Sequence, residues 1–263
     1  MNEEYIIEQR LGNKSSGANI GVQNVYNGIS LEKAVEITNK LFIDNFPKLQ
    51  EYAKEEINKR ILELQEKVFR QLENNKIINF NAFADPDMQY AYYEAQKNYA
   101  RFGTEDMLSI LSDLIVKRVE NTENDYLKRV IDSAITIVGQ LTKSQIDYLT
   151  VIFLLKDVKI NSVNNIEKLK ELFDEIQEEF SPVCSSGISM LKSLGCLEIN
   201  LGEVEKTIAK TYGLNIEEIK AIIPKEFNLV PADYSTSDIG SVISIINAQN
   251  KLRYNFMFET FIH

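Results

Sequence analysis

Histidine is almost missing from this sequence: the only one among its 263 residues is His263, the last of them. Catalysis by a serine or cysteine paired with histidine, and zinc sites built on histidine, would therefore depend on a terminal residue. The two cysteines, Cys184 and Cys196, are too few for a disulfide scaffold and form no C-x-x-C pattern. We expect both thiols to be packed and reduced, and we expect neither a metal site nor a cofactor.

Positive charge is also scarce. The chain has 29 lysine and arginine residues against 39 aspartate and glutamate residues, which gives a net charge of -10 and a pI near 4.9. A surface that binds DNA or anionic lipid needs clustered basic side chains, so we do not expect a nucleic-acid partner. The most apolar run, YLTVIFLL at 148–155, is far shorter than the ~20 residues of a membrane-spanning helix. The opening stretch, MNEEYIIEQR, lacks the apolar centre of a secretory leader, so we expect a cytoplasmic protein.

Glycine is sparse except in one stretch, GNKSSGANIGVQNVYNGIS at 12–30, which holds four of the 11 glycines. A phosphate-binding loop is excluded there, because Ala18 and Asn19 stand where that motif needs Lys and Ser or Thr. The stretch is β-prone and nearly uncharged, yet it is too short to form a stable hairpin by itself. We predict that it pairs with copies of itself in a homo-oligomer, and a disordered leader is the alternative. The residues expected to make this contact are Ile20, Val22, Val25 and Tyr26.

Helical spacing of apolar residues runs from Ser30 to about residue 140. Ser30 suits an N-cap, and Asp85 and Gly103 suit the start and the end of a later helix. Two more helices follow, the first of them capped by Thr104. We therefore predict a β ribbon at 1–29 and a helical bundle at 30–140.

The pattern changes at residue 141. Thr142 and Gln145 form a capping-box pattern before a helix that is apolar nearly all round. An acidic helix at about 163–180, a short helix in SSGISMLKSLG and a strand in CLEINLG follow. Three helices and then a strand are the order of a winged-helix domain, which we predict for 141–263 although no wing hairpin is evident. The helix in the recognition position has one lysine, Lys192, and no arginine, which favours protein contacts over DNA recognition.

Asp85 and Asp87 are the one carboxylate pair whose spacing could hold a divalent cation. Both residues also suit the first turn of a helix, where a carboxylate caps free N–H groups and meets the positive end of the helix dipole. We expect this structural role. A hydrolase that uses acidic residues would have only this pair in its favour.

Tyrosine is concentrated in the segment YAYYEAQKNYARF. Helical spacing places Tyr92, Tyr99 and Phe102 on the core side. Tyr90 and Tyr93 remain as a possible partner surface.

Five segments, in this order, resemble the abortive-infection alpha type of bacterial protein: YYEAQ, MLSILSDLIVKRV, LTKSQIDYL, LKSLGCLEI and STSDIGSVI. The second segment lacks an Ala-Asn pair, and the last lacks the Leu-Thr pair before Gly240. In addition, SSGANIGVQNVYNG is similar to Gly/Asn-rich β tags that precede several bacterial conflict and antiphage proteins. The resemblance implies a role in phage defence, and it brings no catalytic residues with it.

These observations predict an all-α fold, with a helical bundle followed by a winged-helix-like domain and preceded by a short β ribbon. They favour a non-enzymatic, oligomeric, cytoplasmic protein that acts through protein–protein contacts in antiphage defence, with a second copy and a protein or phage component as partners. A winged-helix DNA-binding regulator is the alternative.

Overall fold

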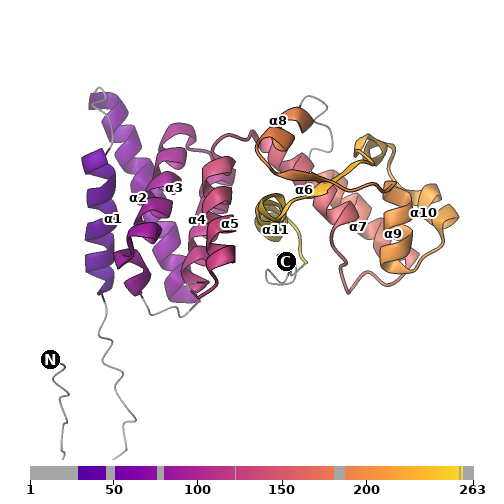
Figure 1. Cartoon of the computed structure of the whole chain (residues 1–263), viewed down its shortest axis with the longest axis horizontal. Coiled ribbons are helices and arrows are strands. Elements are labelled where there is room, and N and C mark those ends of the chain that lie inside the picture. Colours follow the sequence, from indigo (N-terminus) through magenta and orange to yellow (C-terminus); the bar gives the residue numbers. More distant parts are fainter. Residues whose placement is uncertain are drawn as a thin grey trace, which may run out of the picture.

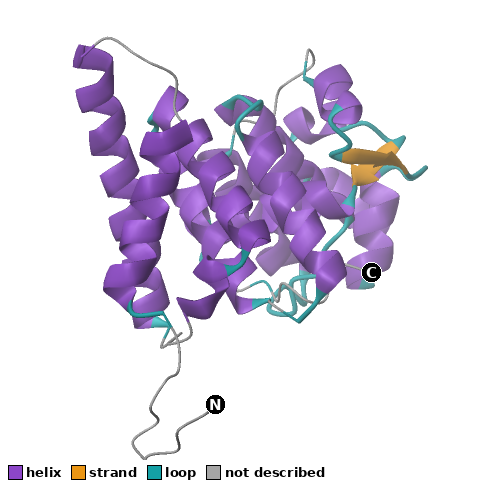
Figure 2. Ribbon diagram, turned by 60° about the vertical axis from the view of Figure 1, so that its left-hand side comes forward, coloured by secondary structure: helices purple, strands orange, loops and turns teal. Residues whose placement is uncertain are grey.

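The computed structural model of the chain describes residues 29–45, 51–75, 80–121, 123–180, 187–254 and 256. Within these ranges the chain is mostly helical, and the only strands are two short ones (Figures 1 and 2). The all-α prediction is therefore confirmed. The predicted β ribbon, with Ile20, Val22, Val25 and Tyr26, lies outside the described residues.

The first half consists of helices that pack side by side (Figure 1). A short 3-10 helix, η1 (Phe80–Ala84), precedes α3 and contacts both α1 and α3. The five α-helices are α1 (Leu31–Asn45), α2 (Glu51–Asn74), α3 (Pro86–Phe102), α4 (Glu105–Glu120) and α5 (Asp125–Val138).

The second half begins with α6 (Lys143–Lys156), α7 (Ile166–Glu179) and α8 (Ile188–Ser193), followed by β1 (Leu197–Ile199). Then come α9 (Val204–Tyr212), α10 (Ile216–Ile222), the 3-10 helix η2 (Lys225–Leu229), β2 (Tyr234–Thr236) and α11 (Asp238–Lys251). The two strands are antiparallel, with Leu197 opposite Thr236 and Ile199 opposite Tyr234. Two helices and a 3-10 turn thus separate two strands that pair.

The helix ends follow the local sequence. The side chains of Asp85, Thr104 and Ser237 each accept a hydrogen bond from a backbone N–H in the first turn of the helix that they cap. Thr142 and Gln145 form the full capping box at the start of α6. Gly103 ends α3 in the left-handed region, at φ 59°, which costs a glycine little. The predictions for Asp85, Gly103, Thr104 and the Thr142–Gln145 capping box are confirmed.

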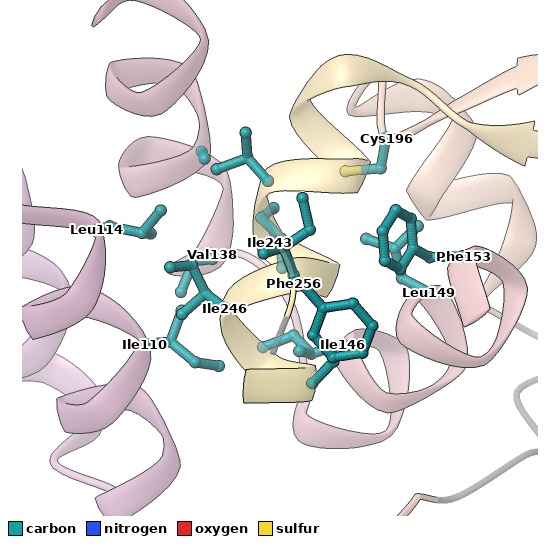
Figure 3. Close-up of a cluster of buried hydrophobic side chains, with 14 of the residues drawn as sticks. Ile110, Leu114, Val138, Ile146, Leu149, Phe153, Cys196, Ile243, Ile246 and Phe256 are labelled. Carbon is teal, nitrogen blue, oxygen red and sulfur yellow. The ribbon is translucent and has the colours of Figure 1, made fainter. Parts of the chain in front are cut away.

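The helix α11 lies between the two halves. It packs on α4 and α5 on one side and on α6 and β2 on the other. Figure 3 shows Ile243 and Ile246 of α11 between Val138 of α5 and Ile146 of α6. All of these side chains belong to one continuous hydrophobic core. The last described helix therefore joins residues on both sides of position 140 into one core.

The helix α6 is the most enclosed element: every residue from Ile146 to Lys156 is buried. This agrees with its sequence, which is apolar nearly all round. No helix in the described ranges is long and apolar enough to cross a membrane.

Candidate functional site

The Asp85–Asp87 pair has a structural role. Asp85 caps α3 by accepting a hydrogen bond from the N–H of Asp87, at 3.0 Å. The carboxylate of Asp87 accepts a hydrogen bond from Arg118 Nη2 at 2.6 Å, and that of Asp132 accepts one from Arg118 Nε at 2.8 Å. A guanidinium thus occupies the place that a cation would take. Among the described residues, no group of three or more His, Cys, Asp or Glu side chains could hold a metal ion.

Arg118 is a feature that the sequence did not indicate. Its side chain is only 2% exposed, although it lies on α4 in a run that reads as an ordinary amphipathic helix. Its two carboxylate partners lie 31 and 14 residues away in the chain, on α3 and α5. Burial raises the pKa of Asp132, and the hydrogen bond from Arg118 acts in the opposite direction. The cluster ties three helices together and leaves no free acid or base.

The tyrosines of α3 divide as their spacing predicts. Tyr92 and Tyr99 are buried, and Tyr90 is 67% exposed. Tyr93 is partly buried. Phe102, which we expected in the core, is 45% exposed, so that expectation was wrong. Phe102 is the last residue of α3, where the chain turns at Gly103, and the guanidinium of Arg101 lies 5.2 Å from the centre of its ring.

Cys196 has no features of a nucleophile. It is fully buried, and burial raises the pKa of its thiol to about 12. Cys184 and His263 lie outside the described residues. Cys196 instead marks a close approach of two elements, because its carbonyl oxygen would lie 2.1 Å from a Cβ atom at Gly240. Glycine at 240 therefore lets α11 start directly against β1.

An open groove of about 390 Å³ lies beside this approach, between α5 and the start of α11. Its polar side chains are largely engaged. Ser237 Oγ donates to the carbonyl of Gly195 at 2.5 Å and accepts from the N–H of Gly240, while the hydroxyl of Tyr126 donates to Asp238. These bonds hold the start of α11, and they leave no nucleophile–base pair.

The outer edge of β2 is closed by two charged residues at the end of α6. Lys156 Nζ donates to the carbonyl oxygens of Ala232 at 3.0 Å and Tyr234 at 2.5 Å, with longer contacts to those of Asn200 and Pro231. Asp157 Oδ2 accepts from the N–H and the hydroxyl of Thr236, each at 2.8 Å. Burial raises the pKa of Asp157 to about 6 and lowers that of Lys156.

The surface around β1 is different. Ile199 and Leu201, at the end of β1 and just after it, are 78% and 79% exposed. Lys192, the single cation of α8, donates to the hydroxyl of Tyr234 at 2.7 Å and lies 4.7 Å from the centre of its ring. Tyr234 is itself the residue opposite Ile199. We call these four residues (Lys192, Ile199, Leu201 and Tyr234) the β1 surface. Single exposed apolar side chains are common, but Ile199 and Leu201 lie two residues apart beside Tyr234, and apolar groups that gather in this way mark contact surfaces.

No direct signal for the β1 surface is present in the sequence. An alternating stretch such as CLEINLG predicts a strand, but it does not tell which apolar side chains the rest of the chain will cover. The exposed apolar residues Ile199 and Leu201 flank the polar Asn200, which would fit a half-buried strand equally well.

One family model, described no further than as "-like", matches residues 28–262. The match begins at residue 28, within the last three residues of the Gly/Asn-rich stretch at 12–30. Among curated proteins and among solved structures, nothing matches the chain.

Proposed function

Because the chain belongs to the family whose model covers residues 28–262, and that family is one of unknown function, we propose a role from the geometry of the β1 surface. We propose that the protein is non-enzymatic and oligomeric, and that it acts through protein–protein contacts in bacterial antiphage defence of the abortive-infection type. The exposure of Ile199 and Leu201 is the observation that carries the protein-contact role.

The charges around β1 support a protein rather than a nucleic-acid partner. DNA recognition draws several phosphate contacts from cationic side chains. Lys192 is held by Tyr234 instead, and the exposed residues of β1 and just after it, Glu198 to Leu201, include no cation. Covering exposed apolar side chains with a protein surface removes them from water, which is favourable. A charged phosphate backbone gives them no apolar surface to pack against.

We also propose that α6, α7, α8, β1 and β2 form a winged-helix-like arrangement. The order of three helices and an antiparallel pair supports this likeness. The pair differs from a wing hairpin, because α9, α10 and η2 lie between the two strands where a wing would have a short turn. This likeness is what favours the alternative function, a DNA-binding regulator. The test is an electrophoretic mobility shift assay with duplex DNA at increasing salt concentrations. Binding whose affinity falls with salt as expected for several phosphate contacts would support the regulator and contradict our proposal.

The defence role is supported by the five segments that resemble abortive-infection alpha proteins. The test is protection of a bacterial host that expresses the full chain, measured as plaque counts over a panel of phages. We expect Ile199→Asp with Leu201→Asp to lose protection at least about tenfold, since each carboxylate would have to be desolvated in the contact. Leu62→Asp is the matched control, because Leu62 is 49% exposed on α2, away from β1.

Loss of protection in both variants, or in neither, would contradict the assignment of the β1 surface. No protection by the wild type against any phage of the panel would contradict the defence role.

Assembly has a separate test. We expect the full chain to be an oligomer by mass photometry and a chain that starts at Leu31 to be a monomer. If the full chain and the shortened chain were both monomers, the oligomeric part of the proposal would be wrong.

A further inference from the structure

The two outer edges of the strand pair differ in how their backbone groups are satisfied. In an edge strand, every second residue turns its N–H and C=O away from the sheet, where they can pair with another strand. On β2 these outward groups are taken: the carbonyl of Tyr234 accepts from Lys156, and the N–H of Thr236 donates to Asp157. No further strand can add to β2 without displacing α6.

The register shows which groups of β1 point outward. The N–H of Asn200 donates to the carbonyl of Asp233, and the N–H of Gly202 donates to that of Ala232. Since the direction alternates, the N–H groups of Ile199 and Leu201 point away from β2. Neither N–H has a hydrogen-bond partner within the described part of the chain, and both side chains are more than three-quarters exposed. Figure 2 places the strand pair at the outer margin of the molecule.

We propose that the open edge of β1 accepts the segment Ala18–Tyr26 of a second copy of this chain as an added strand. This inference rests on the proposed function, which includes assembly through the N-terminal segment. It differs in the partner of that segment: each segment pairs with β1 of a neighbouring copy, and not with the same segment of other copies.

The chemistry of the segment fits this edge. Residues 15–30 contain no charged side chain, so a body with a net charge of -10 does not repel them. Side chains two residues apart lie on one face of a strand, which puts Ile20, Val22 and Tyr26 on the same face. On β1 and its continuation, Ile199 and Leu201 likewise share one face. Pairing the two would cover apolar side chains on both partners while backbone hydrogen bonds form between them.

The position of the segment favours a second copy over the same one. The described chain begins at Ile29, whose N–H donates to Asn81 Oδ1 at 2.9 Å beside α1. Figure 1 shows α1 at one end of the long axis and the strands well toward the other. A contact between the front of one copy and the strand edge of the next is head-to-tail, and such contacts close into a ring or continue as a filament.

Cysteine cross-linking between two full-length variants tests this contact directly. Ile20→Cys, Val22→Cys or Tyr26→Cys protein is mixed with Leu201→Cys protein, oxidised and run on a non-reducing gel. We expect a band of twice the chain mass in at least one mixture, and no such band with Leu62→Cys or with the wild-type chain, which carries only Cys184 and Cys196. A band from Val22→Cys protein alone, with none from the mixtures, would mean that the segments pair with each other and would overturn the inference.

A proline at 199 gives the second test, because it removes the outward N–H together with the isoleucine side chain and leaves the hydrogen bonds to β2 in place. We expect Ile199→Pro to change the oligomer to a monomer in mass photometry, and to unfold within about 4 °C of the wild type since no ladder bond is lost. Ile199→Thr keeps the N–H and a β-branched side chain, and should remain an oligomer.

The outcomes separate the two proposals. If the full chain is an oligomer, the chain from Leu31 is a monomer, and Ile199→Pro still assembles, the inference about β1 is wrong and assembly by the N-terminal segment stands. If the full chain is itself a monomer, both are wrong.

Discussion

Buried charge is handled differently among packed helices, where side chains such as Lys251 and Asp147 pair with one another, and beside the pair of strands. In the first half Arg118 pairs with side chains, the carboxylates of Asp87 and Asp132. In the second half Lys156 and Asp157 pair chiefly with backbone carbonyl and N–H groups of β2 and the residues before it. Helices satisfy their own backbone, so charges among them connect side chains, whereas a pair of strands leaves outward groups that must find partners elsewhere.

The difference also explains why one strand edge is open. The end of α6 covers β2, whereas no described residue bonds the outward N–H groups of Ile199 and Leu201, so the same two-stranded pair has one closed edge and one that is open at these two residues. Natural proteins usually protect such an edge, which makes an unprotected one with apolar side chains a good place to look for a partner.

The largest effect is expected at the start of α11, the helix that packs on both halves. Gly240→Val would place Cβ within 2.1 Å of the carbonyl oxygen of Cys196, and backbone cannot yield as a flexible side chain can. We expect α11 to shift and the free energy of unfolding to fall by about 4 kcal/mol, as for severe overpacking. Urea denaturation measures this free energy of unfolding. Gly202→Ala is the control, since its Cβ would meet only Thr207 Oγ1, at 3.0 Å, and an unchanged Gly240→Val would contradict the close approach.

The first half is tested by Arg118→Met. This change keeps much of the buried stem but leaves Asp132 without its charged partner, and we expect a loss of about 3 kcal/mol in the free energy of unfolding. Asp87 is 61% exposed and can return to water, which limits the loss. Arg129→Met is the matched control, because Arg129 is exposed and makes no ion pair within the described ranges. Equal effects in the two variants would show that the buried cluster contributes nothing.

The second half is tested by Lys156→Met. Carbonyl oxygens around β2 would lose their donor, at a cost of about 2 kcal/mol in urea denaturation. Because α6 and Asp157 still cover the edge of β2, we expect the particle mass in mass photometry to stay that of the wild type. Lys159→Met, at an exposed site, should change neither quantity. Normal stability for Lys156→Met would mean that the carbonyl oxygens around β2 need no donor from α6.

The smallest effect concerns pH. The pKa of Asp157 is about 6 in the folded protein and about 3.9 in an unfolded chain, so the folded state binds this proton more tightly. Stability from this residue is therefore present below about pH 4 and is lost as the pH rises to 6, by about 1–2 kcal/mol for a partly exposed carboxyl group. Lys156 and Glu198 are the charged groups that act on it. We measure the free energy of unfolding by urea denaturation at pH 4 to 7 for the wild type and for Asp157→Asn, and we expect the variant to lack this decline. If the free energies of the two proteins changed with pH in parallel, Asp157 would not be the cause.

The helix ends could be predicted because they are local. Asp85, Thr104 and Thr142 cap helices with atoms two or three residues away, and Gly103 stops α3 by its own backbone freedom. The stripe of α3 was right for Tyr92 and Tyr99 and wrong for Phe102, because spacing gives the side of a helix and not how far its neighbours extend along it.

The β1 surface and the Arg118 cluster could not be predicted in this way. Tyr234 meets Ile199 across α9, α10 and η2, and the partners of Arg118 lie on two other helices. Spacing along one helix or strand holds no information about which distant element arrives beside it.

By itself the sequence determined the all-α class, the starts of the helices and the enclosure of α6, since each depends on propensity, capping or periodicity over a few residues. Only the tertiary structure decided that α11 joins the two halves, that Lys156 and Asp157 close β2, and that Ile199 and Leu201 remain uncovered. Whether a side chain is buried or an outward N–H is satisfied depends on segments far away in the chain, and those meet only when the whole core has packed.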